Sequence, residues 1–293
     1  MRTVSWQPVV DWLFIDGSSL IFRAFHGVPA ALSPPRDVQT NATRGFLDTI
    51  ARLVRERRPR RLAVASDADW RPDWRVQLIP SYKQHRTAEP VPPALIPQFV
   101  QIEAILAAIG VEMVGVAGFE AEDVIATWAA AAGAEAEIEI VSGDRDLFAL
   151  VDGRRVKVLY PEKAGLSVID SGEVEHRYGV PAHLYADFAI LRGDPSDGLP
   201  GLKGVGPKGA AQLIREHGAI RALIERGSFT PAQVDYLERA LVVVPPRIDV
   251  PVDMPAGRLD GYPRDGRETQ RLGAELAVER PIAHLLEALR SGR

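Results

Sequence analysis

Short apolar runs alternate with longer amphipathic stretches along the first 180 positions. Five runs have the length and composition of buried strands, at residues 9–15, 61–66, 111–116, 137–141 and 156–160. Between them, stretches such as 43–54 and 98–109 repeat apolar residues at helical spacing. Strands that alternate with helices predict an α/β fold with a mostly parallel sheet.

The character of the chain changes after residue 180. A helical stretch at 184–191 leads into a loop rich in glycine and lysine, and a helix resumes at Ala210. Gly201 and Gly206 have the spacing of a nucleotide-binding P-loop, but Pro207 stands where that motif needs its lysine. A helix–glycine turn–helix unit fits better, because its backbone N–H groups and lysines can hold phosphates without reading bases.

Carboxylates follow the predicted strands. Asp16 and Asp67 end the first two runs, and Asp144 and Asp146 lie on the turn after 137–141. Further acids stand at predicted helix starts or before the glycine-rich loop: Glu120, Glu122, Asp123, Asp194 and Asp197. Taken singly, such acids are also explained as helix caps or turn formers. Ligand sites in parallel α/β sheets gather at the carboxyl ends of strands, so their recurrence there predicts one acidic site.

Converging carboxylates would repel one another without cations. Oxygen ligands suit Mg²⁺ or Mn²⁺, and two such ions can promote phosphodiester hydrolysis. The chain has no cysteine and no paired-histidine spacing that would offer a zinc site. The sequence therefore predicts a two-metal hydrolase.

Residues 70–86 mix aromatic and basic side chains, with Trp70, Trp74 and Tyr82 beside four bases. This composition suits single-stranded nucleic acid, since rings stack on bases and cations neutralise phosphate. A helical excursion with snorkelling arginines is the alternative. A net charge of −4 and a pI of about 5.9 argue weakly against a nucleic-acid partner, but residues 52–61 carry six arginines against one acid.

Length and composition add few constraints. The 293 residues with 46% hydrophobic content can bury a full core. We find neither an apolar run long enough to span a membrane nor a signal peptide, so we expect a cytoplasmic protein with no membrane partner.

Several motifs, in order along residues 12–255, resemble the 5′-nuclease family, which includes the N-terminal domain of bacterial DNA polymerase I and the flap endonucleases. The matching stretches are FIDGSSLIFRAFHG, SYKQHR, GFEAEDVIAT, SGDRDLFALV and LRGDPSDGLPGLKGVGPKGAAQL. The resemblance implies a PIN-like α/β core over residues 1–180, with a helical arch at about 70–97. It implies a helix-three-turn-helix DNA clamp within residues 181–293 and a stand-alone bacterial form, which we expect to be monomeric. The implied activity is 5′-3′ exonuclease and flap endonuclease cleavage of DNA with 5′ ends, flaps or nicks.

The resemblance also carries residue roles. The metal-site acids it implies are Asp16, Asp67, Glu120, Asp123, Asp144, Asp146, Asp194 and Asp197, with Glu122 at one further acidic position. It places Arg75 near the scissile phosphate and Tyr82, Lys83 and Arg86 in the arch, and we assign catalytic roles to Arg75 and Lys83. Expected DNA contacts are Arg23, Tyr82, Arg86, Lys203, Gly204, Gly206 and Lys208, and the family's glycine loop holds K⁺ through backbone oxygens. The resemblance further implies a closing strand at 241–252 and a C-terminal helix at 272–289.

Three positions depart from the family pattern. Glu122 replaces the usual Asp, Gly198 the usual Asn, and Gly209 the usual Thr. We expect Glu122 to turn outward and act on metal-bound water at one remove, and the two glycines to loosen the clamp. A DNA-structure-binding protein with weak catalysis is the alternative function. A PIN-type ribonuclease would lack the glycine-rich loop.

Overall fold

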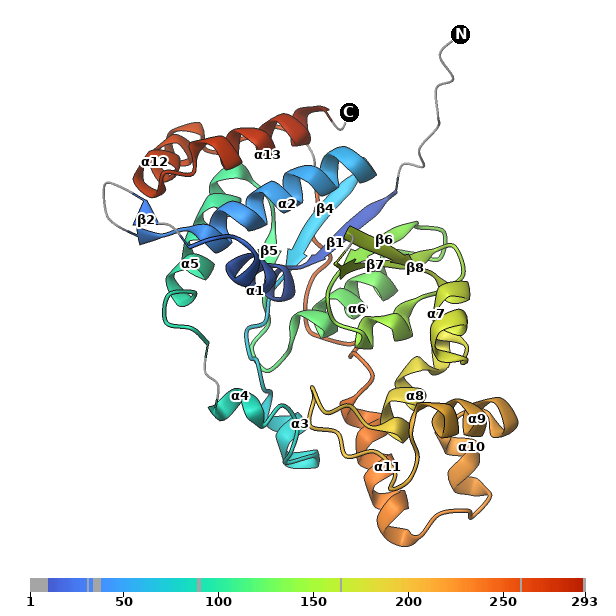
Figure 1. Ribbon diagram of the computed structural model, residues 1–293. Coiled ribbons are helices and arrows are strands. Elements are labelled where there is room, and N and C mark those ends of the chain that lie inside the picture. The colour runs from blue at the N-terminus through green and yellow to red at the C-terminus, as the bar shows by residue number, and fades with distance from the viewer. Residues whose placement is uncertain are drawn as a thin grey trace.

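A mostly parallel sheet forms the centre of the molecule (Figure 1). The computed structural model describes residues 10–30, 32–33, 38–88, 91–163, 165–258 and 260–291. Within these residues six strands form this sheet in the order β5-β4-β1-β6-β7-β8. Their bounds are β1 Trp12–Asp16, β4 Arg61–Ala65, β5 Met113–Val114, β6 Ile138–Val141, β7 Val156–Glu162 and β8 Gly165–Ile169. The first five are the predicted strands and pair in parallel, whereas β8 pairs antiparallel with β7. Residue 9 of the first predicted strand lies outside the described residues.

Both faces of the sheet are covered by helices. Successive side chains of a strand point to opposite faces, so Leu13 and Ile15 of β1 enter one core while Trp12 and Phe14 enter the other. The first core is shared with α1 Gly17–Gly27, α2 Asn41–Arg57, α5 Ile96–Ile109, α12 Gly266–Leu276 and α13 Glu279–Ser291. The second is shared with α6 Ala121–Ala131, the 3-10 helix η1 Asp146–Leu150 and the helices that follow β8.

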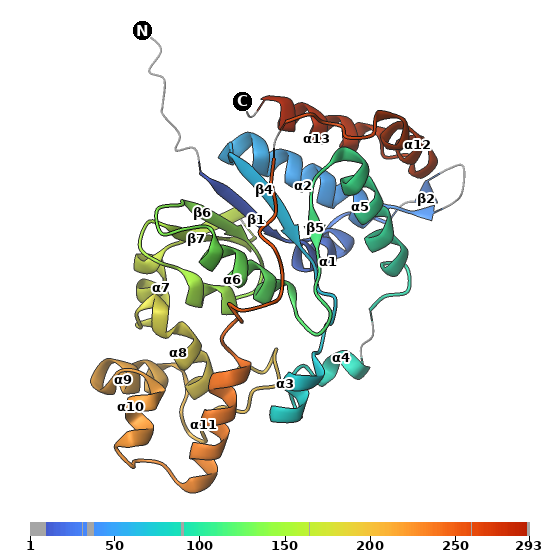
Figure 2. The same cartoon turned by 180° about the vertical axis from the view of Figure 1, so that it is seen from behind.

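The segment between β4 and α5 passes the carboxyl ends of the strands. It contains two short helices, α3 Asp73–Leu78 and α4 His85–Ala88, and Figures 1 and 2 show both beyond the end of the sheet. This is the stretch predicted as an arch at about 70–97, of which residues 89 and 90 lie outside the described residues. A small antiparallel pair, β2 Leu32–Ser33 with β3 Val38–Gln39, joins α1 to α2.

A helical unit follows β8 and faces the arch across the strand ends (Figure 1). It consists of α7 Ser171–Tyr178, η2 Ala182–Leu184, α8 Tyr185–Arg192, α9 Pro207–His217, α10 Ile220–Glu225 and α11 Pro231–Val243. The glycine-rich loop connects α8 to α9, as the helix–turn–helix prediction requires. The described residues hold no helix long and apolar enough to cross a membrane.

Two predictions for the C-terminal region are wrong. Residues 241–252 are not a strand, because α11 continues to Val243 and the chain then returns along α6 without regular structure. Pro245 and Pro246 cannot donate backbone hydrogen bonds, and the segment bonds α6 instead, through Thr127 Oγ1. Residues 272–289 are not one helix, since Ala277 adopts a left-handed conformation (φ 51°) that ends α12 before α13 begins.

Candidate active site

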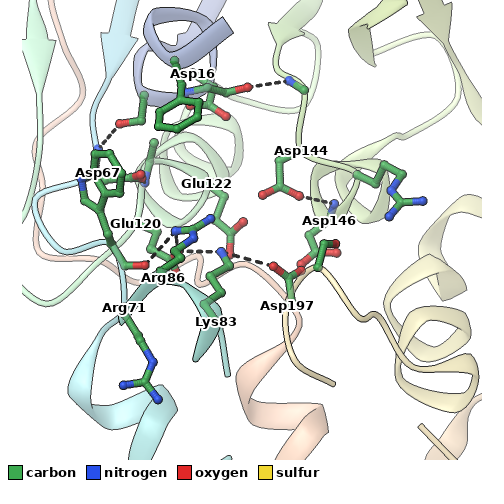
Figure 3. A pocket seen from close by; sticks show the side chains of 18 of the residues that line it. Asp16, Asp67, Arg71, Lys83, Arg86, Glu120, Glu122, Asp144, Asp146 and Asp197 are labelled. Atoms are coloured by element: carbon green, nitrogen blue, oxygen red, sulfur yellow. Dashed lines mark hydrogen bonds and ion pairs between the residues drawn. The ribbon is translucent and has the colours of Figure 1, made fainter. Parts of the chain in front are cut away.

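All the predicted acids except Asp123 converge on one pocket at the carboxyl ends of β1, β4 and β6 (Figure 3). The pocket has a volume of about 870 Å³. Its acidic lining comprises Asp16, Asp67, Asp69, Glu120, Glu122, Asp144, Asp146, Asp194 and Asp197. Its basic lining comprises Arg71, Lys83, His85, Arg86 and Arg145. Strand ends from separate parts of the chain therefore build one cavity, with arch cations facing carboxylates.

Three carboxylates are arranged for a cation. Among the described residues, Glu122, Asp144 and Asp146 each offer an oxygen within 4.8 Å of the others. The turn after β6 is locked, because Asp144 Oδ1 accepts from the Asp146 N–H at 2.9 Å and Ser142 Oγ accepts from the Asp144 N–H at 2.9 Å. Burial raises the pKa of Asp146, and the charge of Asp144 raises it further. Buried carboxylates that repel one another and present only oxygen fit a hard divalent cation.

The direction of the Glu122 side chain differs from the one expected. Glu122 was expected to turn out from the site, yet its side chain is buried and points toward Asp144 and Asp146 (Figure 3). Burial raises its pKa well above the ordinary value, against the lowering effect of Lys83. The longer side chain crosses the space between α6 and the turn after β6, so the geometry makes it a direct candidate ligand.

Asp16 and Asp67 form a second acidic pair at the ends of β1 and β4. Asp16 caps α1 by accepting from the Ser19 N–H at 3.0 Å, and Asp67 accepts from the Ala121 N–H at 2.7 Å. Burial and the charge of Asp67 raise the pKa of Asp16 to about 7. Burial and the charge of Glu120 raise the pKa of Asp67 to about 6. Within the described part of the chain no cationic side chain lies within ion-pairing distance of Asp16 or Asp67, so the pair can accept a cation.

Glu120 is already paired. Lys83 Nζ and Tyr82 Oη each donate to its carboxylate at 2.7 Å, and Arg75 donates at 2.5 Å. Although burial opposes ionisation, Lys83 and Arg75 lower the pKa of Glu120. Glu120 is therefore held ionised by the arch, which limits its freedom to bind a metal. Tyr82 is buried in this contact, so its ring is not free to stack on a base as expected.

Arg75 and Asp123 do not line the pocket, which argues against the two roles expected of them. The Arg75 guanidinium is fully buried and donates to Asp123 Oδ1 at 2.7 Å and to the Val243 carbonyl at 3.1 Å. Asp123 also accepts from the Arg247 N–H at 2.8 Å and from the Glu120 N–H as part of a capping box. Arg75 also pairs with Glu120 and Glu122, two acids of the pocket lining, from behind the start of α6. This geometry supports neither a metal ligand at Asp123 nor a phosphate contact at Arg75.

The absence of a side chain at Gly198 is explained by a close contact with the arch and not by the glycine-rich loop. The Lys83 N–H donates to the Asp197 carbonyl at 2.9 Å, which brings the arch turn against residue 198. A Cβ on Gly198 would lie 1.9 Å from the Ser81 carbonyl oxygen, and its φ of +69° already favours glycine. Glycine therefore tightens this contact, contrary to the expectation of a looser clamp. At Gly209 a Cβ would meet only ordinary contact at 3.7 Å.

Asp194 and Asp197 line the pocket wall opposite α6. Arg192 and Arg145 donate to Asp194 Oδ2 at 2.8 and 3.1 Å, and Lys83 Nζ lies 3.7 Å from Asp197 Oδ1. Arg145 and Arg71 also line the pocket; Arg71 is one of the four bases noted in residues 70–86, whereas no role was predicted for Arg145. The signal for Arg145 was its place between Asp144 and Asp146.

The expected DNA contacts outside the pocket are exposed. Arg23 lies on α1, and Lys203, Gly204, Gly206 and Lys208 lie on the loop before α9 and its first turn. None of them lines the pocket. Arg86 does: its Nη1 donates to the Trp70 carbonyl at 2.8 Å and lies 3.7 Å from Glu120.

Comparisons with known proteins agree with this arrangement. Residues 11–179 match the 5′-3′ exonuclease N-terminal resolvase-like domain, and residues 180–241 match the 5′-3′ exonuclease C-terminal SAM fold. A 5′-3′ exonuclease of Streptomyces coelicolor is 44% identical, with 94% of this chain and 99% of that protein covered. One of Mycobacterium tuberculosis is 41% identical, with 94% and 97% covered. DNA polymerase I of Mycobacterium bovis is 40% identical over 73% of this chain but only 24% of its own length.

Solved structures share the fold. The bacteriophage T5 D15 flap endonuclease, in a complex with DNA and metal ions, has a TM-score of 0.65 at 18% identity and covers 96% of this chain and 99% of its own. The catalytic core of Rad2 in complex with DNA has a TM-score of 0.61 at 18% identity, with 97% and 93% covered. The predicted fold and nuclease activity are confirmed, and the chain belongs to the 5′-3′ exonuclease family.

Proposed function

We propose that this 5′-3′ exonuclease also cleaves 5′ flaps, and that two divalent cations in the acidic pocket support the hydrolysis. The observation that carries the proposal is the convergence of Glu122, Asp144 and Asp146 in a pocket walled by the cations of the arch. Phosphodiester hydrolysis needs both parts, because carboxylates recruit the metal and cations offset the phosphate charge.

Seven carboxylates are the candidates to hold the metals. Glu122, Asp144 and Asp146 would hold one cation, and the candidates for the second are the other acids that line the pocket, Asp16, Asp67, Asp194 and Asp197. The chemistry that two bound cations supply is activation of the attacking water and stabilisation of the leaving oxygen. All these ligands are carboxylate oxygens, which suit both Mg²⁺ and Mn²⁺. We infer that Glu122, with one methylene more than Asp, tolerates the less rigid Mn²⁺ coordination well.

The arch residues would orient the substrate strand. Lys83 and Arg86 lie on the arch side of the pocket, and Glu120 fixes the position of the Lys83 ammonium group (Figure 3). A phosphate above the metal site would meet these two cations, which would hold it and offset charge that develops during cleavage. Glu120 would then act through Lys83 rather than by binding metal.

The glycine-rich loop would hold the duplex part of the substrate. Lys203 and Lys208 are exposed on either side of Gly204 and Gly206, where α9 begins. Backbone N–H groups and lysines at a helix start bind phosphates without sequence preference, and the loop carbonyls could accept K⁺. The T5 and Rad2 relatives were solved with DNA. We further propose a monomer that acts on cytoplasmic DNA.

A DNA-binding protein with weak catalysis is less well supported. Its main support was the replacement of the family's usual Asp by Glu122, yet Glu122 still offers an oxygen within 4.8 Å of those of Asp144 and Asp146. The curated relatives that match nearly the whole chain are named as exonucleases.

A substrate panel tests the proposal. The purified protein is incubated with a 5′-labelled flap, a nicked duplex and single-stranded DNA, each with Mg²⁺, Mn²⁺ or EDTA. We expect cleavage of the flap and of the 5′ end at the nick, in either metal, and none in EDTA. Cleavage that persists in EDTA would refute the metal assignment, and cleavage confined to the nicked duplex would refute the flap assignment.

A further inference from the structure

Arg145 is a cation of the active-site pocket to which none of the roles above has been given. It lies between Asp144 and Asp146, on the turn that leads into η1, and it lines the pocket. Its Nη2 donates to Asp194 Oδ2 at 3.1 Å, and 35% of its side chain is exposed. An arginine in this place is next to two candidate metal ligands, lines the pocket and keeps about a third of its side chain exposed.

The partner of Arg145 is held by other groups as well. Arg192 Nη2 donates to the same Asp194 oxygen at 2.8 Å, from a side chain that is only 15% exposed. The other oxygen of Asp194 accepts from the Ser196 backbone N–H at 3.0 Å and from the Ser196 hydroxyl. Asp194 would therefore keep a cation and two further hydrogen bonds if Arg145 moved away, so the departure of Arg145 would not leave a buried charge unpaired.

Two other pocket cations lack this freedom. Lys83 is buried and donates to Glu120 at 2.7 Å, where it balances the Glu120 charge. Arg71 donates to the carbonyls of Tyr82 and Pro80 at 2.6 and 2.8 Å and so ties down the arch turn. Arg145 combines exposure with a partner that another arginine already neutralises.

We propose that Arg145 binds a phosphate of the cleaved strand, releasing Asp194 to Arg192 when substrate enters. The planar guanidinium fork matches two phosphate oxygens, a geometry that the arch lysine cannot offer. With Lys83 and Arg86 on the arch side, the strand would be held by cations on both sides of the acidic site. This inference rests on the proposed function, because it assumes that the pocket binds DNA.

The test compares Arg145→Gln and Arg145→Lys with Arg280→Gln, a change at an exposed arginine on α13 that does not line the pocket. DNA affinity for the 5′ flap is measured by fluorescence anisotropy over a range of salt, with each change placed in an Asp146→Asn background to suppress cleavage. Loss of one phosphate contact lowers the slope of log affinity against log salt by about 0.7 to 0.9. We expect this fall for Arg145→Gln, an unchanged slope for Arg145→Lys, and no effect of Arg280→Gln.

Single-turnover cleavage in the otherwise wild-type protein gives the second readout. We expect Arg145→Gln to slow cleavage by roughly tenfold to a hundredfold, with Arg145→Lys in between, because a charge-assisted contact is lost or weakened. An unchanged salt slope would overturn the proposal. So would a slower rate that is fully restored by raising the metal concentration, since Arg145 would then act only through Asp194. If Arg145→Gln lowers the melting temperature, Arg145→Lys decides the test. For this variant the salt slope of DNA binding must stay unchanged and the rate of cleavage must fall. If the wild type cleaves nothing, the proposed function fails, while the salt slope still decides whether Arg145 contacts phosphate.

Discussion

Replacing Arg75 by methionine separates a structural from a catalytic role for this residue. The methionine side chain is shorter and uncharged, so it fills only part of the buried site while four interactions disappear. These are the contacts to Glu120, Glu122, Asp123 and the carbonyl of Val243. They join the arch, the start of α6 and the end of α11 at one guanidinium.

The expected loss of stability follows from the geometry. Removing one partner of a buried ion pair costs about 3–5 kcal/mol, because the remaining charge is left unpaired. Glu120 retains Lys83 and Tyr82, and Asp123 retains two backbone N–H donors, so we expect the lower part of this range. For a chain of this size, about 3 kcal/mol lowers Tm by roughly 6–12 °C.

The assay is thermal unfolding of Arg75→Met beside Arg280→Met, an exposed control on α13. Single-turnover cleavage and DNA affinity are measured well below both Tm values. We expect a lower Tm, slower cleavage because Glu120 is no longer held, and an unchanged salt slope of DNA binding. A Tm within about 2 °C of the wild type, together with a reduced salt slope, would show instead that Arg75 contacts phosphate, and our reading of its burial would be wrong.

Further predictions concern the acids of the pocket and the arch contact at Gly198. Glu122→Ala should slow Mg²⁺-dependent cleavage by more than about 100-fold in single-turnover assays. Removing a residue that only supports a metal ligand typically slows the reaction about 10–100-fold, so a direct ligand should cost more. A loss of rate below roughly tenfold would exclude Glu122 as a ligand. Metal binding at pH 6.5 should release at least about one proton, because the pKa values of Asp16 and Asp67, about 7 and about 6, lie far above the ordinary value and those of Glu122 and Asp146 are raised as well. The same shifts make the metal-free fold lose stability as pH rises from about 4 to 7, because these carboxyls ionise freely in the unfolded chain but at a cost in the folded one. Calorimetry in two buffers of different ionisation enthalpy measures the release, and equal heats at pH 6.5 would contradict it. Gly198→Ala should lower Tm by more than Gly227→Ala, which shares a positive φ but has open space around it; equal changes would show that the Ser81 contact yields easily.

The sequence predicted the parts of the fold that depend on local pattern. The five parallel strands were visible as apolar runs, and their acids had to meet because parallel strands end at one edge. The position of β8 was missed because residues 165–169 are half exposed and lack a continuous apolar run. The C-terminal errors had local causes, in the two prolines after α11 and in the left-handed Ala277.

Side-chain direction within the acidic stretch could not be predicted in the same way. Glu120, Glu122 and Asp123 are near neighbours in sequence, yet they point to the arch, the metal pocket and Arg75 respectively. Which of these carboxylates can bind a metal depends on which of them already pair with Arg75 and Lys83, two residues distant in sequence. The resemblance to the family named acids that the structure brings into one pocket, but the geometry does not support the roles it implied for Asp123 and Arg75, nor the outward direction that we expected of Glu122.

Asp146→Asn tests the central claim, that the converged carboxylates hold the metals for cleavage. The substitution keeps the shape of the side chain and removes one charge from the Glu122, Asp144 and Asp146 group. Single-turnover cleavage of a 5′ flap in Mg²⁺ and in Mn²⁺ is measured together with DNA affinity. We expect cleavage to be abolished in both metals while the affinity for DNA stays the same or rises, because repulsion of phosphate is reduced. Cleavage within roughly tenfold of the wild type, about 1.4 kcal/mol of barrier, would contradict it.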